Sequence, residues 1–228
     1  MKYATRSADL PDTSRHLPNA DSTSALGGIT KRVFDVIGAI LAIVLLSPLL
    51  VMLALLVKLS DGGSVFFRHP RVGRNGETFK CLKFRTMAEN SEEILAAHLA
   101  ACPEAREEWK ATRKLKNDPR ITRVGAVLRK LSLDELPQLF NILRGDMSFV
   151  GPRPVVREEL DLYGNAAVYY LRTRPGLTGL WQISGRNDVP YGKRVDFDQQ
   201  YVENWSLTSD LIIIIRTLPA VISSRGSY

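Results

Sequence analysis

The chain has 228 residues, a formal net charge of +7 from 31 basic and 24 acidic side chains, and a pI near 9.5. That length suits one domain with an appendage and can bury a real core. The positive charge indicates an anionic partner, such as nucleic acid, phospholipid or a phosphorylated substrate, and does not choose among them. The histidines lack the sequence spacing of a zinc site, which argues against zinc chemistry.

Residues 1–30 are rich in Ser, Thr, Asp, Ala, Gly and Pro and show little apolar periodicity. We therefore expect a mostly disordered tail. Residues 36–57 follow without a single charge, and at about 1.5 Å per residue they would form a helix of about 33 Å. Because the hydrocarbon core of a bilayer is about 30 Å thick, this segment predicts a membrane helix rather than a buried core helix.

Ser47-Pro48 interrupts the apolar segment, and proline removes a helical hydrogen bond and kinks the helix. Residues 36–47 reach only about 18 Å, too short to cross a bilayer alone. Basic residues flank both ends of the segment, so the positive-inside rule gives no orientation. Two topologies remain: a kinked span, or a re-entrant helix that breaks at Ser47-Pro48 and returns to the same side. In the second, the Ser47 hydroxyl could meet a carbonyl that the proline frees.

The next segment predicts a small β-hairpin, because Gly62-Gly63 and Asn75-Gly76 are turn signals between short apolar runs. Strand alternation then places Cys81, Lys83 and Arg85 on one face. The two cations could be solvated, which is the usual case, or they could point at phosphates.

Helical patterns dominate the rest of the chain. Residues 89–116 predict a helical hairpin, with Pro103 between its two halves. Two more helical patterns lie around Ser132. Residues 208–222 predict a helix that packs on the core or lies at the membrane surface, with Trp205 as an interfacial anchor.

The stretch LSLDELPQLF places Asp134 and Glu135 side by side among leucines. The structural interpretation is a capping box, in which Ser132 caps the helix and Glu135 reaches back to it. Acidic residues also suit the positive end of a helix dipole. The alternative is a pair of carboxylates that carries chemistry, and the stretch alone favours the cap.

A second stretch, GPRPVV, predicts a guanidinium held on a stiff loop. Pro152 and Pro154 fix their own φ angles, and Pro154 also restricts Arg153. The fork of an arginine matches phosphate oxygens, although a plain turn would use the same residues. Farther on, RPGLTGLWQISGRND adds Arg186 and DQQYVENWSL adds Asp198.

KCLKFRTM, LRKLSLDELPQLFNILRGDMSFVGPRP, RPGLTGLWQISGRND and YVENWSL occur together and in this order. With these motifs the chain resembles the bacterial sugar transferase family, the monotopic polyprenol-phosphate phosphoglycosyl transferases, from about Lys31 to Tyr228. The resemblance implies a mostly helical α+β fold, with a small cytosolic α/β catalytic domain and surface-lying amphipathic helices. We expect a tail at 1–30, a re-entrant membrane helix at 31–58 broken at Ser47-Pro48, and a catalytic domain at 59–228.

The resemblance implies an enzyme that moves a sugar 1-phosphate from a UDP-sugar to undecaprenyl phosphate and releases UMP, the first membrane step of exopolysaccharide synthesis. Galactose is the favoured sugar and glucose the next. The enzyme would lie on the cytosolic face of the bacterial inner membrane, in contact with membrane lipid. A homo-oligomer and contacts with downstream glycosyltransferases are compatible with this assignment, and nucleic acid is not an expected partner.

The matched positions carry roles that the resemblance implies. Asp134 matches the nucleophile that forms a covalent aspartyl phosphosugar, and Glu135 matches the neighbour that helps to hold Mg²⁺. Asp198 matches an acidic position near the site and is a third candidate metal ligand. Further matches are candidates for binding the substrate: Lys83, Arg85, Arg129, Pro152, Arg153, Pro154 and Arg186.

Two other functions compete with this one. A Leloir-type glycosyltransferase would transfer the sugar without phosphate, release UDP and form no covalent intermediate. A membrane-tethered basic adaptor would bind nucleic acid or anionic lipid without catalysis. Against the adaptor, the sequence shows no recognised nucleic-acid motif and its aromatic residues do not interleave with its basic runs.

Overall fold

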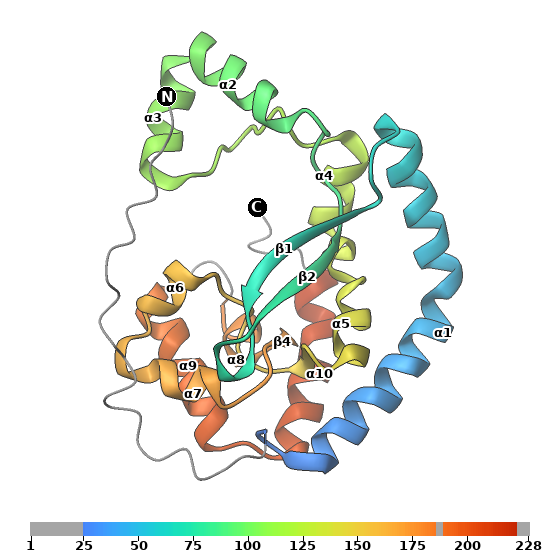
Figure 1. Cartoon of the computed structure of the whole chain (residues 1–228), viewed down its shortest axis with the longest axis vertical. Coiled ribbons are helices and arrows are strands. Elements are labelled where there is room, and N and C mark those ends of the chain that lie inside the picture. The colour runs from blue at the N-terminus through green and yellow to red at the C-terminus, as the bar shows by residue number, and fades with distance from the viewer. Residues whose placement is uncertain (1–24, 186–188, 223–228) are drawn as a thin grey trace.

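The computed structural model of the chain describes residues 25–185 and 189–222. The predicted tail lies outside the described residues as far as residue 24. The first element is a single helix, α1 (Gly28–Asp61), which forms one edge of the molecule (Figure 1). With 34 residues it is about 51 Å long. It extends beyond the predicted 31–58 at both ends, by residues 28–30 and 59–61.

The predicted break at Ser47-Pro48 is wrong as a break in helical structure, because α1 continues through Pro48. Proline at 48 cannot donate to the carbonyl of Val44, four residues earlier. The Ser47 hydroxyl donates to that carbonyl at 2.8 Å instead, as expected for a serine that satisfies a freed backbone group. The Ser47 hydroxyl thus takes the place of the backbone N–H that Pro48 lacks, which explains why the helix tolerates the proline.

One face of α1 packs on the rest of the molecule along both of its halves. In the first half, Ala39 packs with Leu139 and Ile142 of α5 (Gln138–Arg144). In the second half, Val57 packs with Leu128 of α4 (Arg123–Lys130). The opposite face is apolar and exposed. Its residues are Ile29, Val33, Ile37, Ile40, Leu41, Val44, Leu45, Val51, Met52, Leu55, Leu56 and Leu59.

The predicted β-hairpin is confirmed. Strand β1 (Phe66–Val72) pairs antiparallel with β2 (Thr78–Phe84) across a short 3₁₀ turn, η2 (Arg74–Gly76). Asn75 adopts a φ of 57°, in the left-handed region where asparagine is among the favoured residues. The register places Cys81 opposite His69.

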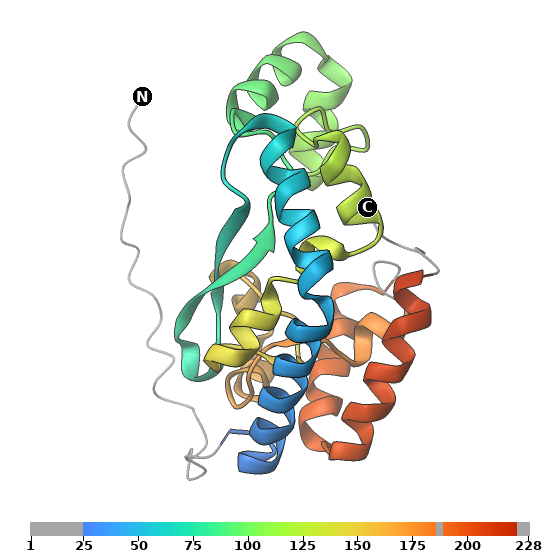
Figure 2. The ribbon, with the colours of Figure 1, turned by 90° about the vertical axis from the view of Figure 1, so that its right-hand side faces the viewer.

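The predicted helical hairpin is confirmed as α2 (Ser91–Ala101) and α3 (Pro103–Thr112), with the proline at the first turn of α3. It projects at the end of the molecule opposite the start of α1 (Figures 1 and 2). In α2 no described residue is buried, and in α3 Ala105 is the one that is. The hairpin is therefore held mainly at its base, where the amide of Ala88 donates to the carbonyl of Arg120 at 2.8 Å.

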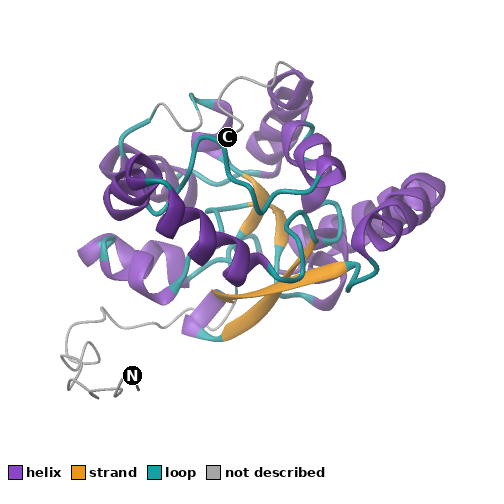
Figure 3. Ribbon diagram, turned by 90° about the horizontal axis from the view of Figure 1, so that it is seen from above, coloured by secondary structure: helices purple, strands orange, loops and turns teal. Residues whose placement is uncertain are grey.

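A second, parallel pair of short strands lies between helices, as Figure 3 shows from above. It consists of β3 (Ser148–Val150) and β4 (Gly176–Thr178). The remaining elements surround it: η3 (Leu133–Glu135), α6 (Arg157–Asp161), η4 (Gly164–Ala166), α7 (Ala167–Leu171), α8 (Leu180–Ile183), α9 (Tyr191–Glu203) and α10 (Leu207–Ile222). The predicted mostly helical α+β class is confirmed for the residues that the structure describes.

The helix predicted at 208–222 is present as α10, and it packs against α8 and β3 while part of its surface stays exposed. Asp210 and Ile213 face inward, and Leu211, Ile212 and Ile215 are exposed. The anchoring of the chain at the membrane surface by Trp205 stays a prediction. The indole N–H of Trp205 donates to Asp210 of α10 at 3.1 Å.

Candidate active site

A cleft of about 690 Å³ lies between the β1–β2 hairpin, the η3 turn and the β3–β4 pair. Among the described residues that line it, basic side chains outnumber acidic ones by six to three. The basic residues are Arg71, Lys83, Arg85, Lys114, Arg129 and Arg153. The acidic residues are Glu89, Asp134 and Glu135. This excess of cations in a concave site favours ligands that carry phosphate.

Asp134 and Glu135 reach the cleft because the backbone turns sharply just before them. Ser132 adopts a φ of 55°, in the left-handed region, and makes no side-chain cap hydrogen bond. The predicted capping box is therefore wrong: the positive φ turns the Ser132 side chain away from the free N–H groups that it would cap. The acidic pair sits instead on the single 3₁₀ turn η3, between α4 and α5.

Lys83 of β2 bridges the two carboxylates. Its Nζ lies 2.6 Å from Oε1 of Glu135 and 3.7 Å from Oδ2 of Asp134. Burial acts to lower the pKa of Lys83, but Glu135 and Asp134 outweigh burial and raise it. The alternation expected for the hairpin places Lys83 here, since Cys81, Lys83 and Arg85 all line the cleft.

The surroundings shift the pKa values of the two carboxyl groups in opposite directions. Burial raises the pKa of Asp134, while Lys83 acts against this shift and Glu135 adds to it. Burial also acts to raise the pKa of Glu135, but Lys83 and Arg153 together hold it below its usual value. Neighbouring carboxyl groups whose pKa values diverge are typical of sites where each group has its own task.

Arg153 is exposed between two buried prolines, Pro152 and Pro154. This arrangement agrees with the expected stiff loop. Its guanidinium lies 5.9 Å from the ring centre of Trp181, a cation–π contact. Pro154 lines the cleft with Arg153, whereas Pro152 is packed behind it. The predicted site residue Arg186 lies outside the described residues.

Two other predicted arginines reach the cleft with part of their donors already engaged. Arg85 pairs with Asp61 at the end of α1, and its Nη1 is buried without a hydrogen-bond partner. Arg129 donates from Nε to the Thr86 hydroxyl at 2.8 Å. Both could bind phosphate through their remaining N–H groups.

Asp198 is not among the described residues that line the cleft, so its expected role as a metal ligand beside the acidic pair stays a prediction. It lies on the buried face of α9 and accepts a hydrogen bond of 2.8 Å from the hydroxyl of Tyr163. Burial raises the pKa of Asp198 to about 7, against a lowering effect of that hydrogen bond. A carboxyl group in this setting belongs to the core.

Sequence reasoning missed cleft residues on β1. His69 and Arg71 line the cleft, although the RHPRVG segment had no predicted role. The register pairs Phe67 with Lys83 and His69 with Cys81, so these side chains share one face of the hairpin. The turn at Asn75-Gly76 and strict alternation could have located them. Gln138 and Trp181 also line the cleft, and no local sequence signal indicates them.

The carboxylate oxygens of Asp134 and Glu135 are ligands of the kind that Mg²⁺ takes in proteins. Among the described residues, no group of three or more His, Cys, Asp or Glu could hold an ion by itself. Mg²⁺ commonly takes one or two carboxylates and completes its shell with substrate phosphate and water. Asp134 and Glu135 beside an open cleft fit that pattern, and they do not fit a site built from protein ligands alone.

Comparison with known proteins supports the resemblance seen in the sequence. The profile of the family described as bacterial sugar transferase matches residues 26–224. The chain is 62% identical to the exopolysaccharide production protein ExoY of Rhizobium meliloti (strain 1021), over 100% of both chains. It is 53% identical to the undecaprenyl-phosphate galactose phosphotransferase of Salmonella typhimurium (strain LT2), over 87% of this chain and 41% of that protein. It is 39% identical to the UDP-glucose:undecaprenyl-phosphate glucose-1-phosphate transferase of Caulobacter vibrioides, over 88% of this chain and 72% of that protein.

Proposed function

We propose that this chain, which belongs to the bacterial sugar transferase family, transfers a hexose 1-phosphate from a UDP-sugar to undecaprenyl phosphate and releases UMP. The reaction would initiate the synthesis of an exopolysaccharide, in line with the name of its full-length relative. The observation that carries the proposal is the cleft itself. It combines a carboxylate pair with an excess of cations, as transfer between two phosphate-bearing substrates requires.

In the first step Asp134 acts as the nucleophile. A carboxylate oxygen attacks the phosphorus that bears the sugar, the bond from that phosphorus to the bridging oxygen breaks, and UMP leaves with the electron pair. The product is a phosphosugar joined to Asp134 as an acyl phosphate. Arg153 lies where it could bind the nucleotide phosphate and offset the charge of the diphosphate.

In the second step a phosphate oxygen of undecaprenyl phosphate attacks the same phosphorus. The acyl phosphate bond breaks and the Asp134 carboxylate is restored. Lys83 would hold the two carboxylates in place throughout. Asp134 and Glu135 would hold Mg²⁺, which when bound supplies positive charge against the diphosphate.

The position of α1 supports a re-entrant arrangement over a span. At its start, Lys31 pairs with Asp210, and at its end, Asp61 pairs with Arg85. The same folded domain therefore holds both ends of the helix, while the outer face exposes apolar side chains suited to lipid. We place the domain on the cytosolic face of the inner membrane, where a UDP-sugar and a lipid phosphate can meet.

Galactose is the proposed sugar, with glucose as the alternative. One relative is named for galactose phosphate transfer and is 53% identical, and another is named for glucose 1-phosphate transfer and is 39% identical. The higher identity favours galactose.

Intact-protein mass spectrometry tests the proposal. The purified protein is mixed with Mg²⁺ and UDP-galactose, UDP-glucose or UDP-N-acetylglucosamine, without undecaprenyl phosphate. We expect a mass gain of one phosphosugar and UMP in solution. Asp134→Asn should show neither, and turnover with undecaprenyl phosphate should fall by about 10³-fold or more. The matched control is Asp161→Asn, the same change at an exposed residue of α6, which should behave like the unmodified chain.

Other outcomes would point elsewhere. Release of UDP, with no adduct, would identify a Leloir-type glycosyltransferase. Full turnover in Asp134→Asn would remove Asp134 as the nucleophile. Tight, salt-sensitive binding to DNA that Asp134→Asn leaves unchanged, together with no turnover, would favour a basic adaptor.

A further inference from the structure

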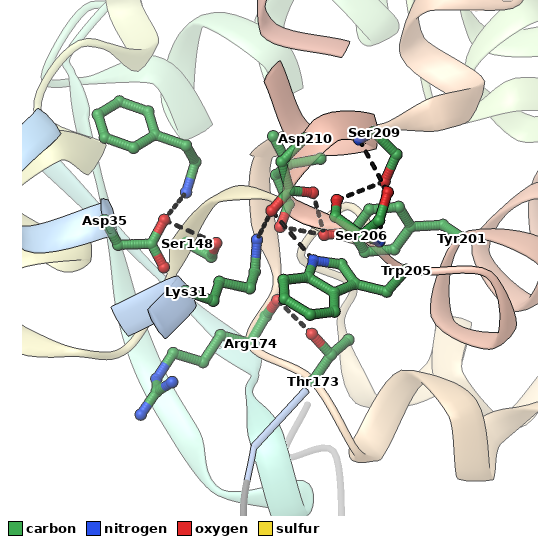
Figure 4. A network of polar contacts seen from close by, with 12 residues as sticks. Lys31, Asp35, Ser148, Thr173, Arg174, Tyr201, Trp205, Ser206, Ser209 and Asp210 are labelled. Atoms are coloured by element: carbon green, nitrogen blue, oxygen red, sulfur yellow. Dashed lines mark hydrogen bonds and ion pairs between the residues drawn. The ribbon is translucent and has the colours of Figure 1, made fainter. Parts of the chain in front are cut away.

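A buried polar cluster joins the start of α1 to the catalytic domain, far from the acidic pair in sequence (Figure 4). The Nζ of Lys31 donates to Oδ2 of Asp210 at 2.5 Å. Tyr201 donates to Oδ1 of Asp210 at 2.8 Å, and its hydroxyl also lies 3.0 Å from the carbonyl oxygen of Val150. Lys31 and Asp210 are almost fully buried, so the start of the membrane helix is locked in place.

Asp35, one helical turn after Lys31, is hydrogen-bonded to strand β3. Its Oδ1 accepts a hydrogen bond from the Ser148 hydroxyl at 2.9 Å and another from the amide of Phe149 at 3.0 Å. Figure 4 shows this carboxylate pointing from α1 toward Ser148. Asp35 is fully buried, and its Oδ2 has no hydrogen-bond partner in the described structure. The hydrogen bonds that the carboxylate does make therefore both go to β3.

Strand β3 leads directly into the loop that carries Arg153. The amide of Gly151 donates to the carbonyl of Thr178 at 3.0 Å, and the amide of Gly176 donates to the carbonyl of Pro152 at 2.8 Å. No side chain larger than hydrogen fits at Gly151, because a Cβ there would meet the carbonyl oxygen of Arg174 at 2.5 Å. The backbone from β3 to Pro152 is therefore tightly fixed, and the prolines around Arg153 pass a shift of β3 on to its guanidinium.

We propose that Asp35 is a positioning residue, which seats the Arg153 loop in the cleft through β3. This assignment rests on the proposed function for its effect on UDP-sugar use. Under this proposal, the position of Arg153 in the cleft depends on how α1 docks against β3. A helix seated against β3 holds Arg153 at the cleft, and a displaced helix releases it.

The test compares three variants of the full chain in detergent or lipid nanodiscs. Asp35→Leu removes both hydrogen bonds to β3. Asp35→Asn keeps an oxygen that can accept both, so it should restore what leucine loses. The control is Arg32→Met, since Arg32 lies on the same helical turn but binds the carbonyls of Ile142 and Leu143 on α5.

Two measurements decide the proposal. We expect amide hydrogen exchange in residues 148–151 to rise about tenfold in Asp35→Leu, relative to α9, and to stay near the original rate in Asp35→Asn and Arg32→Met. We also expect the KM for the UDP-sugar to rise about tenfold in Asp35→Leu alone, with kcat and membrane association nearly unchanged.

Faster exchange throughout the domain would overturn the proposal, since it would mean that Asp35 only stabilises the fold. Loosened β3 with an unchanged KM would overturn it as well. If the unmodified chain transfers no sugar phosphate from any donor, the proposed function fails, and the exchange pattern alone decides whether Asp35 seats the loop.

Discussion

Two regions of the molecule place a lysine beside two carboxylates, and they differ in their access to solvent. In the cleft, the side chains of Lys83, Asp134 and Glu135 are 25%, 13% and 31% exposed. At the start of α1, Lys31 and Asp210 are 4% and 0% exposed, and Asp35 is fully buried. The same chemical groups thus form an accessible cluster in one place and a sealed cluster in the other.

The difference shows how surroundings assign a task to ordinary side chains. In the cleft cluster, water or a metal ion can reach the carboxylates and phosphate can reach Lys83, so no charge there is left buried and alone. The sealed cluster cannot exchange partners, because an unpaired charge in the interior costs several kcal/mol, on the order of 3–5. One cluster is suited to chemistry, and the other fixes α1 to the domain.

The largest expected effect comes from breaking the sealed cluster. Lys31→Met leaves Asp210 buried without its cation and should lower the free energy of unfolding by about 3–5 kcal/mol. The double variant Lys31→Met/Asp210→Asn should recover part of this loss, because it removes the stranded charge. Chemical unfolding in detergent measures both. A double variant less stable than Lys31→Met would show that the charge itself is not the cause.

Asp198 adds a third case to the two clusters: a buried carboxyl group that is hydrogen-bonded to a tyrosine. Folded Asp198 keeps its proton up to a pH of about 7, whereas the unfolded chain loses it near 3.8. The folded state binds more protons between these values, so this group makes stability fall as pH rises through that window. Asp198→Asn should remove that slope and raise the unfolding free energy at pH 8 by at most about 4 kcal/mol.

The measurement is thermal unfolding at several pH values between 4 and 8. Because Tyr163 can donate to asparagine as it does to Asp198, transfer activity should persist in Asp198→Asn. Loss of activity with an intact fold would return Asp198 to the list of metal ligands.

The smallest expected effect comes from the accessible cluster. Lys83→Met removes the cation that lowers the pKa values of Glu135 and Asp134. Both pKa values should rise, so the acid limb of the pH–rate profile moves to higher pH, and the rate at neutral pH falls about tenfold. UMP release across a pH series checks this shift. An unchanged acid limb would mean that neither carboxyl group controls it.

Local patterns explain which parts of the fold the sequence could predict. The long apolar helix, the hairpin around Asn75-Gly76 and the Pro103 hairpin depend on neighbours in sequence, and all three are present. The Ser132 cap failed because its motif is compatible with more than one backbone conformation. Ser132 has a positive φ at the junction of α4 and η3, and the motif does not specify that conformation.

The residues of the candidate site also divide into those that local sequence patterns could locate and those that they could not. Lys83, Arg85 and Arg153 could be located from strand alternation and loop stiffness, and the structure places them in one cleft. The buried contacts of Asp35 and Asp198 could not be predicted, since each partner lies far along the chain. A carboxylate with a distant partner looks the same in sequence as one that faces solvent.

The pairing of Lys31 with Asp210 also bears on how the protein is made. These residues are 179 positions apart, so the apolar helix leaves the ribosome long before its partner does. Its apolar outer face is thus exposed before the domain that holds both of its ends has been made. The contact between α1 and α10 can therefore close only after most of the domain has been synthesised.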